Sequence, residues 1–397
     1  MIIRKISNYG DKKLKKLIKI TLIASALSMP LIAHADWSIK ALDARIFLGA
    51  NNQEQVLDIN NLGQVVGSYF IGDPQIFHAY MTGENGVGFK DLGTLGGDRS
   101  VAYGINDLGQ VVGQAQLANK GPTHAFITGP DGLGMRDLNV PFPSEFSRAS
   151  SINNSGQVAG DTSARAFITG PDGVGVTVKN IGQTIPVDIN ESGRLVGQIN
   201  GTAFITGPDG KVITPVQPLP GGLASLASAI NDSGQVVGRS GASYGIQAYV
   251  TGENGVGITN LGTFGGSFSE ATDINNAGEV VGIASLETPE AHSFLYSHGG
   301  MTDLSLLDVV IGNNWSNIQV TAINDNGQIL GYGTLIDPIS GLANTRGFIL
   351  SYTSDTVFNP QPIFIPAAPI PEPETYAMLL AGLGLIGFIA RRRKQNS

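Results

Sequence analysis

Residues 59–67 read Ile-Asn-Asn-Leu-Gly-Gln-Val-Val-Gly, and six variants of this stretch follow along the chain. The variants are INDLGQVVG at 105–113, INNSGQVAG at 152–160, INESGRLVG at 189–197, INDSGQVVG at 230–238, INNAGEVVG at 274–282 and INDNGQILG at 323–331. The second residue is Asn in all seven copies, and successive copies are 37 to 49 positions apart. Self-similarity at such a period is typical of an architecture that stacks one supersecondary unit many times.

The pattern within each copy predicts a β-hairpin. An apolar residue precedes Asn-x-x-Gly, and a short run rich in β-branched residues follows it. Asn favours the first position of a tight turn because its side chain hydrogen-bonds the local backbone, and Gly accepts the positive φ that closes the turn. A strand, a tight turn and a second strand together make the hairpin.

A second hairpin follows the first in every unit. Its first strand reads HAYM at 78–81, HAFI at 124–127, RAFI at 165–168, TAFI at 202–205, QAYV at 247–250, HSFL at 292–295 and RGFI at 346–349. Its turn reads GPDG at 129–132, 170–173 and 207–210, and GENG at 83–86 and 252–255. A last short strand leads into DLGTLGG at 91–97 and NLGTFGG at 260–266.

Four short strands in a unit of about 40–45 residues are typical of one β-propeller blade, and propellers usually have about four to eight blades. We therefore predict an all-β fold, a seven-bladed β-propeller of four-stranded blades, over residues 36–355. A single blade cannot bury both of its faces, so stability must come from packing between neighbours.

The two ends of the repeat region predict how the ring closes. The seventh unit lacks a fourth strand, whereas residues 38–43 (SIKALD) have the pattern of such a strand and no unit of their own. We predict that this segment pairs into the last blade. An open β-solenoid is the alternative, and the variable repeat length together with the single orphan strand disfavours it.

The glycine-rich composition agrees with a fold that has many turns. The 397 residues include 54 Gly and no Cys, and 42% are hydrophobic. Gly is thus about twice as frequent as its usual share of about 7%. The apolar content argues against disorder, and the absence of Cys excludes disulfide frameworks, thiolate zinc sites and cysteine nucleophiles.

Residues 1–35 are predicted to form a secretory signal peptide with a signal helix, exported by the Sec machinery. Five lysines between positions 12 and 19 precede an apolar stretch at 20–33, and Ala33-His34-Ala35 forms a small-x-small cleavage site before Asp36. A transmembrane helix is the alternative, but the apolar run is short and Pro30 interrupts it.

The C-terminal region has three parts after a Pro-rich linker at 356–370, which we expect to be a stiff spacer. The parts are Pro371-Glu372-Pro373, an uncharged stretch at 375–390, and Arg391-Arg392-Arg393-Lys394. The middle part predicts a single membrane helix near the lower limit of about 17 residues for a spanning segment. The basic cluster that follows would hold the end of the chain in the cytoplasm, so the body lies outside.

This tail, residues 371–397, resembles the PEP-CTERM sorting signal of Gram-negative bacteria, which is also known as the ice-binding protein C-terminal domain. The second name carries no evidence of ice binding here. The resemblance implies that an exosortase recognises the tail, that the helix anchors the protein transiently in the inner membrane, and that the protein then reaches the cell surface or extracellular matrix. The sorting residues it implies are Pro371, Glu372, Pro373, Arg391, Arg392 and Arg393. A plain C-terminal anchor is the alternative, and it would need no Pro-Glu-Pro.

The repeats themselves also resemble a known family. The His-Ala-Phe strand, the DLGTLGG loop and the Ile-Asn-x-x-Gly hairpin are together similar to the HAF family of extracellular repeats over residues 57–350. The third, fourth and fifth units depart from that pattern because they lack the His, and the long glycine loop shrinks in the third and fourth.

Recurring polar residues are the candidates for chemistry, and each has a structural interpretation. His78, His124 and His292 share one position, where other units carry Arg, Thr or Gln, which indicates a polar slot at a strand edge. Two slots hold acids in several units each, and we interpret them as turn caps: Asp58, Asp188 and Asp273 in one, Asp107, Asp232 and Asp325 in the other. The turns lack the alternating acidic spacing of a calcium loop. We expect no catalytic, cofactor-binding or metal-ligating residues.

The charge of the predicted body limits its partners. Residues 36–370 carry 13 basic and 29 acidic residues, a net charge of −16. Nucleic-acid binding needs clustered cations, so we expect none. Aromatic side chains could stack on sugars. We expect the aromatic residues of the recurring strand to lie in the core, and the surface candidates outside that strand are Trp315, Tyr103, Tyr244 and Phe268.

Together these features predict an exported propeller, sorted to the surface or matrix, that acts as a non-enzymatic binding or structural protein associated with exopolysaccharide or biofilm matrix. The alternative is an extracellular polysaccharide hydrolase or lyase on the same scaffold, which rests on analogy of fold alone.

Overall fold

The computed structural model describes residues 36–43, 55–140, 146–163, 165–179, 184–338 and 340–352. All of these belong to the compact unit Met1–Asn359. The predicted signal peptide with Ala33 and Ala35, the linker at 356–370, and the sorting tail with its helix at 375–390 lie outside the described residues. No helix within the described part of the chain is long and apolar enough to cross a membrane.

The described residues form an all-β fold, as predicted, in which antiparallel groups of four strands follow one another along the chain. The first two groups are β2 (Gln55–Ile59), β3 (Val65–Ile71), β4 (Asp73–Met81) and β5 (Lys90–Gly93), then β6 (Gly96–Ile105), β7 (Val111–Leu117), β8 (Thr123–Ile127) and β9 (Arg136–Asp137). The next two are β10 (Ser147–Ile152), β11 (Val158–Thr162), β12 (Ala166–Ile168) and β13 (Thr177–Lys179), then β14 (Thr184–Ile189), β15 (Leu195–Ile199), β16 (Thr202–Thr206) and β17 (Ile213–Pro215).

The remaining groups follow the same order. They are β18 (Ser225–Ile230), β19 (Val236–Gly241), β20 (Ile246–Val250) and β21 (Thr259–Gly262), then β22 (Gly265–Ile274), β23 (Val280–Leu286), β24 (Ala291–Ser297) and β25 (Gly300–Asp303), and finally β26 (Trp315–Ile323), β27 (Ile329–Ile336), β28 (Ala343–Tyr352) and β1 (Trp37–Ala41). A short helix, α2 (Asp308–Gly312), precedes β26. Single parallel pairs, Phe77 with Arg99 and Ile246 with Phe268, join neighbouring groups into two eight-stranded sheets.

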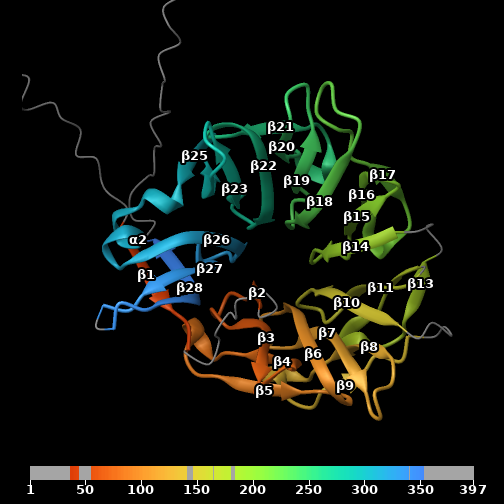
Figure 1. Cartoon of the computed structure of the whole chain (residues 1–397). Coiled ribbons are helices and arrows are strands. Elements are labelled where there is room, and N and C mark those ends of the chain that lie inside the picture. The colour runs from red at the N-terminus through yellow and green to blue at the C-terminus, as the bar shows by residue number, and fades with distance from the viewer. Residues whose placement is uncertain are drawn as a thin grey trace, which may run out of the picture. The chain divides into compact units, whose positions relative to one another are not determined.

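The groups succeed one another around a central axis, and the first strand of each lies nearest the centre (Figure 1). The ring closes as predicted, because β1 pairs antiparallel with β28, from Trp37 opposite Tyr352 to Ala41 opposite Phe348. The last hairpin also bonds to the first, since Asn324 Nδ2 donates to Asn60 O at 2.8 Å. This contact excludes an open solenoid.

The Asn-x-x-Gly turns form as the sequence indicates. In the first, Asn60 Oδ1 accepts hydrogen bonds from the backbone N–H groups of Leu62 at 3.1 Å and Gln64 at 2.9 Å. Gly63 has a φ of 71°, a conformation that costs glycine little. The turn joins the innermost strand β2 to β3, so each copy of the motif brings polar side chains to the axis of the ring.

The turn of the second hairpin packs against the turn of the first in the same unit. Single-turn 3-10 helices form here, for example η2 (Pro130–Gly132), with Asp131 at a φ of 53°. The N–H of Gly132 donates to Gly109 O at 2.8 Å. The same bond joins Gly86 to Gly63 at 2.8 Å, Gly173 to Gly156 at 2.9 Å and Gly255 to Gly234 at 2.9 Å. Both sets of turns therefore lie at one end of the ring.

The hydrophobic core lies between neighbouring groups. The aromatic residue of each recurring strand is at most 1% exposed, and these residues are Tyr80, Phe126, Phe167, Phe204, Tyr249, Phe294 and Phe348. Phe126 of the second group packs in one cluster with Val66 and Met81 of the first. Burial between units rather than within one unit is what a stacked architecture requires.

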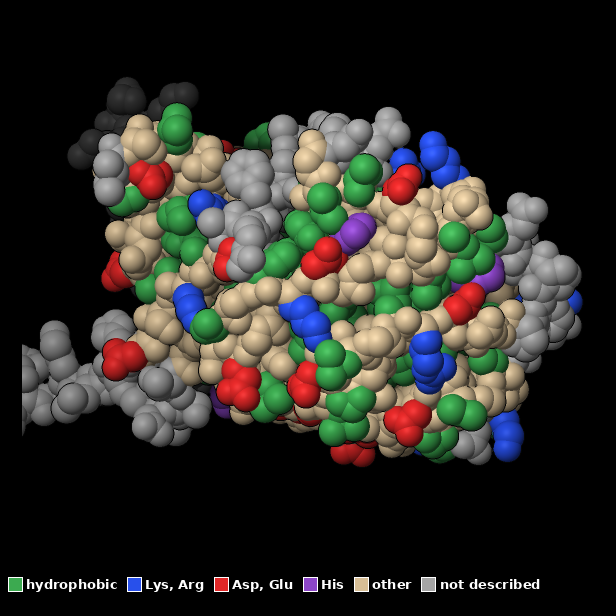
Figure 2. Space-filling view, turned by 90° about the horizontal axis from the view of Figure 1, so that it is seen from below, with side chains coloured by type: hydrophobic (Ala, Val, Ile, Leu, Met, Phe, Trp, Pro, Cys, Tyr) green, Lys and Arg blue, Asp and Glu red, His purple; other side chains and the backbone are tan. Residues whose placement is uncertain are grey.

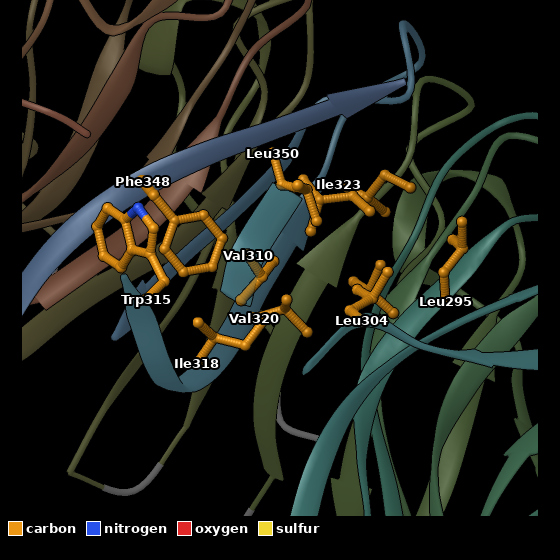
Figure 3. Packing of buried hydrophobic residues seen from close by; sticks show 11 residues of the cluster. Leu295, Leu304, Val310, Trp315, Ile318, Val320, Ile323, Phe348 and Leu350 are labelled. Atoms are coloured by element: carbon orange, nitrogen blue, oxygen red, sulfur yellow. The ribbon is translucent and has the colours of Figure 1, made fainter. Parts of the chain in front are cut away.

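One sequence-based expectation about the surface is wrong. Trp315 was a candidate surface aromatic, but it is 6% exposed and packs in a cluster with Phe348, Val310 of α2 and Leu295 of the preceding group (Figure 3). Its ring centroid lies 5.2 Å from that of Phe348. The insertion that contains α2 covers this position. Tyr244, by contrast, is 87% exposed.

Candidate functional site

A closed ring of asparagine side chains surrounds the axis. Each Nδ2 donates to the backbone carbonyl of the equivalent Asn in the next unit. The bonds run from Asn60 to Asn106 (2.9 Å), Asn106 to Asn153 (3.1 Å), Asn153 to Asn190 (3.1 Å), Asn190 to Asn231 (3.1 Å), Asn231 to Asn275 (3.2 Å), Asn275 to Asn324 (3.2 Å) and Asn324 to Asn60 (2.8 Å). We call these residues the Asn ring.

The Asn ring explains why this position holds Asn in every copy. The predicted local cap is present, but the same side chain also reaches the next unit, which turn chemistry alone does not predict. In the first copy Nδ2 additionally donates to Gln64 Oε1 at 2.7 Å, while Asn60 is only 4% exposed. A turn would accept Asp or Ser here. The invariance of the amide across the copies is the signal that could have revealed the second role.

The next residue of each copy forms a second closed ring, which we call the turn ring. Its members are Asn61, Asp107, Asn154, Glu191, Asp232, Asn276 and Asp325. Each backbone N–H donates to the side-chain oxygen of the next member: Asn61 to Asp107 (2.8 Å), Asp107 to Asn154 (2.8 Å), Asn154 to Glu191 (2.8 Å), Glu191 to Asp232 (3.0 Å), Asp232 to Asn276 (2.9 Å), Asn276 to Asp325 (2.8 Å) and Asp325 to Asn61 (2.9 Å). Asp107, Asp232 and Asp325 therefore cap turns, as predicted, but each caps the turn of the preceding unit.

Three aspartates deeper in the ring also bridge neighbouring units. Asp58 accepts from Ile59 N at 2.8 Å and from Ile105 N of the next unit at 2.9 Å. Asp188 accepts hydrogen bonds from Ile189 N at 2.8 Å and from Ile230 N of the next unit at 2.9 Å. Asp273 likewise accepts from Ile274 N of its own copy at 2.8 Å and from Ile323 N of the next copy at 2.7 Å. These side chains are half-buried, and they too do more than cap a local turn.

The two rings and the three aspartates line a channel with a cavity of about 190 Å³. The lining consists of residues 58–61, 105–107, 151–154, 188–191, 230–232, 273–276 and 323–325. It is strongly acidic, and none of these described residues is Lys or Arg. The turn ring forms the mouth of the channel, at the end of the ring where the turns meet.

Burial raises the pKa of the three deep aspartates. The loss of hydration is the main cause, and it raises the pKa of Asp58 to about 6 and that of Asp273 well above its ordinary value. Burial also raises the pKa of Asp188. Hydrogen bonds from backbone N–H groups oppose these shifts, while mutual repulsion between the carboxylates adds to them. The three carboxyl groups thus release their protons at a higher pH than free aspartate does.

We expect the protein to melt at a higher temperature at pH 5 than at pH 7.5. The pKa of Asp58 is about 6 in the folded chain against an ordinary value of 3.8. The native state therefore retains a proton that the unfolded chain releases, and this stabilisation is complete below pH 3.8 and lost as the pH rises through about 6. Thermal melts monitored by circular dichroism across this range measure it.

The matched control separates these groups from the other acids. The Asp58→Asn, Asp188→Asn and Asp273→Asn triple variant should lose most of the pH dependence, because Asn does not titrate. Asp98→Asn removes an acid at an exposed position, and this variant should retain the pH dependence of the melting temperature. A triple variant with an unchanged melting profile would show that the channel aspartates do not set the dependence.

The recurring histidines each pair with an acid on the adjacent strand. Nδ1 of His78 lies 3.0 Å from Asp91, and Nδ1 of His124 lies 2.7 Å from Asp137. The third pair joins His292 to Asp303 at 2.7 Å. Each pair belongs to one unit, as a polar slot at a strand edge requires. Within the described ranges, no three His, Cys, Asp or Glu side chains gather in a way that could hold a metal ion.

Basic side chains do not gather on the side of the ring seen in Figure 2. Lys and Arg are scattered there among acidic and apolar side chains. Several cations of the described chain bond to nearby groups instead, such as Arg148 to Asp161 at 2.9 Å and Arg239 to Glu270 at 2.9 Å. This surface is unlike the continuous basic patch that a nucleic-acid backbone requires.

Comparison with protein families identifies the tail. Residues 369–394 match the PEP-CTERM protein-sorting motif, which confirms the resemblance predicted for this region. The motif implies export, membrane-linked sorting to the surface and processing by an exosortase. The comparison with curated proteins finds no match.

Among solved structures, the β-propeller domain of the Trilobed protease from Pyrococcus furiosus is 10% identical with a TM-score of 0.48, over 78% of this chain and 97% of that one. YCF48 bound to D1 peptide is 11% identical with a TM-score of 0.44, and the match covers 83% of this chain and 100% of that one. A fungal alcohol oxidase of the AA5 family, in complex with copper, is 11% identical with a TM-score of 0.46, and the match covers 80% of this chain and 76% of that one. At such identities the likeness concerns the fold alone.

Proposed function

We propose that this protein is exported, sorted to the cell surface or extracellular matrix, and acts there as a non-enzymatic binding or structural protein. The observation that carries the proposal is the sorting motif at 369–394, which follows the repeat region in the same chain. We infer that each four-stranded group is one blade, so that the body is a seven-bladed propeller over residues 36–355. The HAF-like repeats also support an extracellular location.

The polar residues at the axis support a role without catalysis. The acids of the channel accept backbone hydrogen bonds that hold neighbouring units together, as Asp58 does for Ile59 and Ile105. A carboxylate that caps two backbone groups has a structural use, and its upward pKa shift follows from burial. The partners we infer are the Sec machinery, an exosortase, the inner membrane through a helix at 375–390, and exopolysaccharide of the matrix.

Sorting is tested in a Gram-negative host that carries an exosortase. We expect the full chain to reach the surface or medium, and a Pro371→Ala, Glu372→Ala and Pro373→Ala variant to stay in the inner membrane, because the motif is no longer recognised. Pro362→Ala with Pro366→Ala in the preceding linker, outside the matched motif, is the matched control and should be sorted normally. Immunoblots of cell fractions measure the outcome, and equal release of both variants would contradict the proposal.

The enzymatic alternative has one observation in its favour, the raised pKa of Asp58 in a channel, because shifted carboxyl groups also occur at catalytic sites. Incubation of the purified chain with exopolysaccharide distinguishes the two. We expect binding without release of oligosaccharides. Release that Asp58→Asn abolishes would overturn the non-enzymatic proposal.

A further inference from the structure

Exposed aliphatic side chains gather at the end of the ring that carries the channel mouth. Val87, Leu133, Val174 and Val256 each follow a 3-10 turn of the second hairpin, and they are 58, 62, 65 and 72% exposed. Leu62 and Leu108, 44 and 54% exposed, lie in the first-hairpin turns. We call these six residues the aliphatic arc. Exposed apolar surface of this kind marks interaction sites.

Hydrogen bonds place the aliphatic arc beside the acidic mouth. Leu62 directly follows Asn61 of the turn ring, and its carbonyl accepts from Asn85 N at 3.0 Å. Asp131 N bonds in the same way to Leu108 O at 3.2 Å, which brings Leu108 next to the turn that ends at Leu133. Apolar side chains thus lie around the mouth in units one, two, three and five.

The charge at this end of the ring is predominantly negative. The turn ring contributes Asp107, Glu191, Asp232 and Asp325, and the exposed second-hairpin turns add Glu84, Asp131, Asp172 and Glu253. Cations also lie at this end. Arg194 of the fourth first-hairpin turn donates to Thr206 O of its own unit at 3.2 Å. Three others donate to turn carbonyls of the neighbouring unit. Lys40 Nζ donates to Asn85 O at 2.9 Å, Lys90 Nζ to Asp131 O at 2.6 Å, and Arg136 Nη2 to Asp172 O.

We propose that this end of the ring docks a basic protein segment, which places a Lys or Arg side chain in the acidic mouth and covers the aliphatic arc with its own apolar residues. Complementary charge selects a cationic partner. The cavity of about 190 Å³ is smaller than the roughly 300–1,000 Å³ of pockets that enclose small molecules, so it suits a single side chain.

The same observations disfavour the other occupants. An anionic lipid surface and a second copy of this chain, with its body at −16, would both bring like charge against the mouth. The aliphatic arc holds no aromatic side chain on which a sugar ring could stack. The proposal rests on the binding role proposed above. It does not rest on the sorting of the protein, because binding is measured with the purified chain.

The test uses the full chain in mild detergent and a fluorescent ten-residue peptide of alternating Leu and Lys, measured by anisotropy. We expect the peptide to bind and its Leu-Glu counterpart not to bind. Leu62→Ser, Val87→Ser, Leu108→Ser and Leu133→Ser together should weaken binding about tenfold, because they remove apolar contact area. Glu191→Gln with Asp232→Asn should weaken it several-fold and reduce its dependence on salt.

The matched control replaces aliphatic residues at the opposite end of the ring. Leu223 precedes the start of β18, and Leu342 lies between β27 and β28; they are 98 and 65% exposed. Leu223→Ser with Leu342→Ser should leave peptide binding within about twofold of the original, a difference that corresponds to little free energy.

Three results would overturn the proposal. The first is no binding of the Leu-Lys peptide, or equal binding of the Leu-Glu peptide. The second is an equal loss in the arc variant and the control. The third is that the arc variant keeps its affinity for the peptide but loses affinity for vesicles of phosphatidylglycerol and phosphatidylethanolamine. Since every variant carries the same tail, that last difference would assign the arc to a membrane surface.

Discussion

Replacement of Asn231 by Ala should lower the free energy of unfolding by about 3–5 kcal/mol, because each buried polar group left without its partner costs about 1–3 kcal/mol. The side chain is 3% exposed. Its Nδ2 donates to Gln235 Oε1 at 2.8 Å and to Asn275 O at 3.2 Å, and its Oδ1 accepts from Gln235 N at 3.0 Å. The substitution removes all three bonds and opens the Asn ring.

Two further variants separate the local cap from the bond between units. Asn231→Asp keeps the size and the acceptor of the local cap but sets a carboxylate oxygen against Gln235 Oε1 and Asn275 O, so it should cost at least as much as Ala. Ser233→Ala alters an exposed residue of the same turn and should change stability by less than about 0.5 kcal/mol. Denaturant unfolding of the full chain measures all three, and an Ala effect no larger than that of Ser233→Ala would refute a structural role for the Asn ring.

Replacement of Gly238 by Ala should cost at least about 3 kcal/mol, the upper range for overpacking a core. A Cβ on Gly238 would lie 2.0 Å from Leu226 O and 3.1 Å from Ala227 Cα. Both are backbone atoms of β18, which pairs with β19 through Ala227 opposite Gly238. They cannot move away without breaking the pairing of the innermost strands. The final Gly of the motif is therefore required by close approach.

Five other copies show the same contact. The distances from an added Cβ to the facing carbonyl oxygen are 1.9 Å at Gly113, 2.2 Å at Gly160, 2.3 Å at Gly197, 2.1 Å at Gly282 and 2.5 Å at Gly331. Gly312 in α2 is the matched control, since an added Cβ there would meet nothing within 4 Å. Gly312→Ala should be neutral or slightly stabilising. Equal effects of Gly238→Ala and Gly312→Ala on the thermal melt would contradict this explanation.

The hairpins and the closing strand could be predicted from the sequence because they depend on local chemistry. Asn60 caps its turn and Gly63 takes a positive φ, as the pattern Asn-x-x-Gly indicates. The pairing of β1 with β28 followed from one missing strand at one end of the repeats and one spare strand at the other. The signal peptide and the membrane helix stay predictions, since residues 1–35 and 375–390 lie outside the described part of the chain.

The bonds between units could not be predicted in the same way. Asp107 looks like a local cap in the sequence, yet it accepts from Asn61 N, 46 positions earlier. Trp315 likewise lies outside the recurring strands in sequence but is buried against Phe348. The partner of Asp107 belongs to a different strand group. Trp315 and Phe348 share one group, but the cluster that buries them also includes Leu295 of the preceding group. Both positions therefore depend on how the groups are arranged around the axis.

The sequence by itself determined the repeat unit, its two hairpins, the order of the strands and the sorting tail, because turns, strand patterns and targeting signals depend on residues close together in the chain. Only the tertiary structure decided that the Asn residues form a closed ring, that the acids meet in one channel, and that the exposed aliphatic residues lie around its mouth. The physical reason is that each side chain finds its partner in a neighbouring unit 37 to 49 residues away, or 264 where the ring closes, and such contacts exist only once the units are assembled.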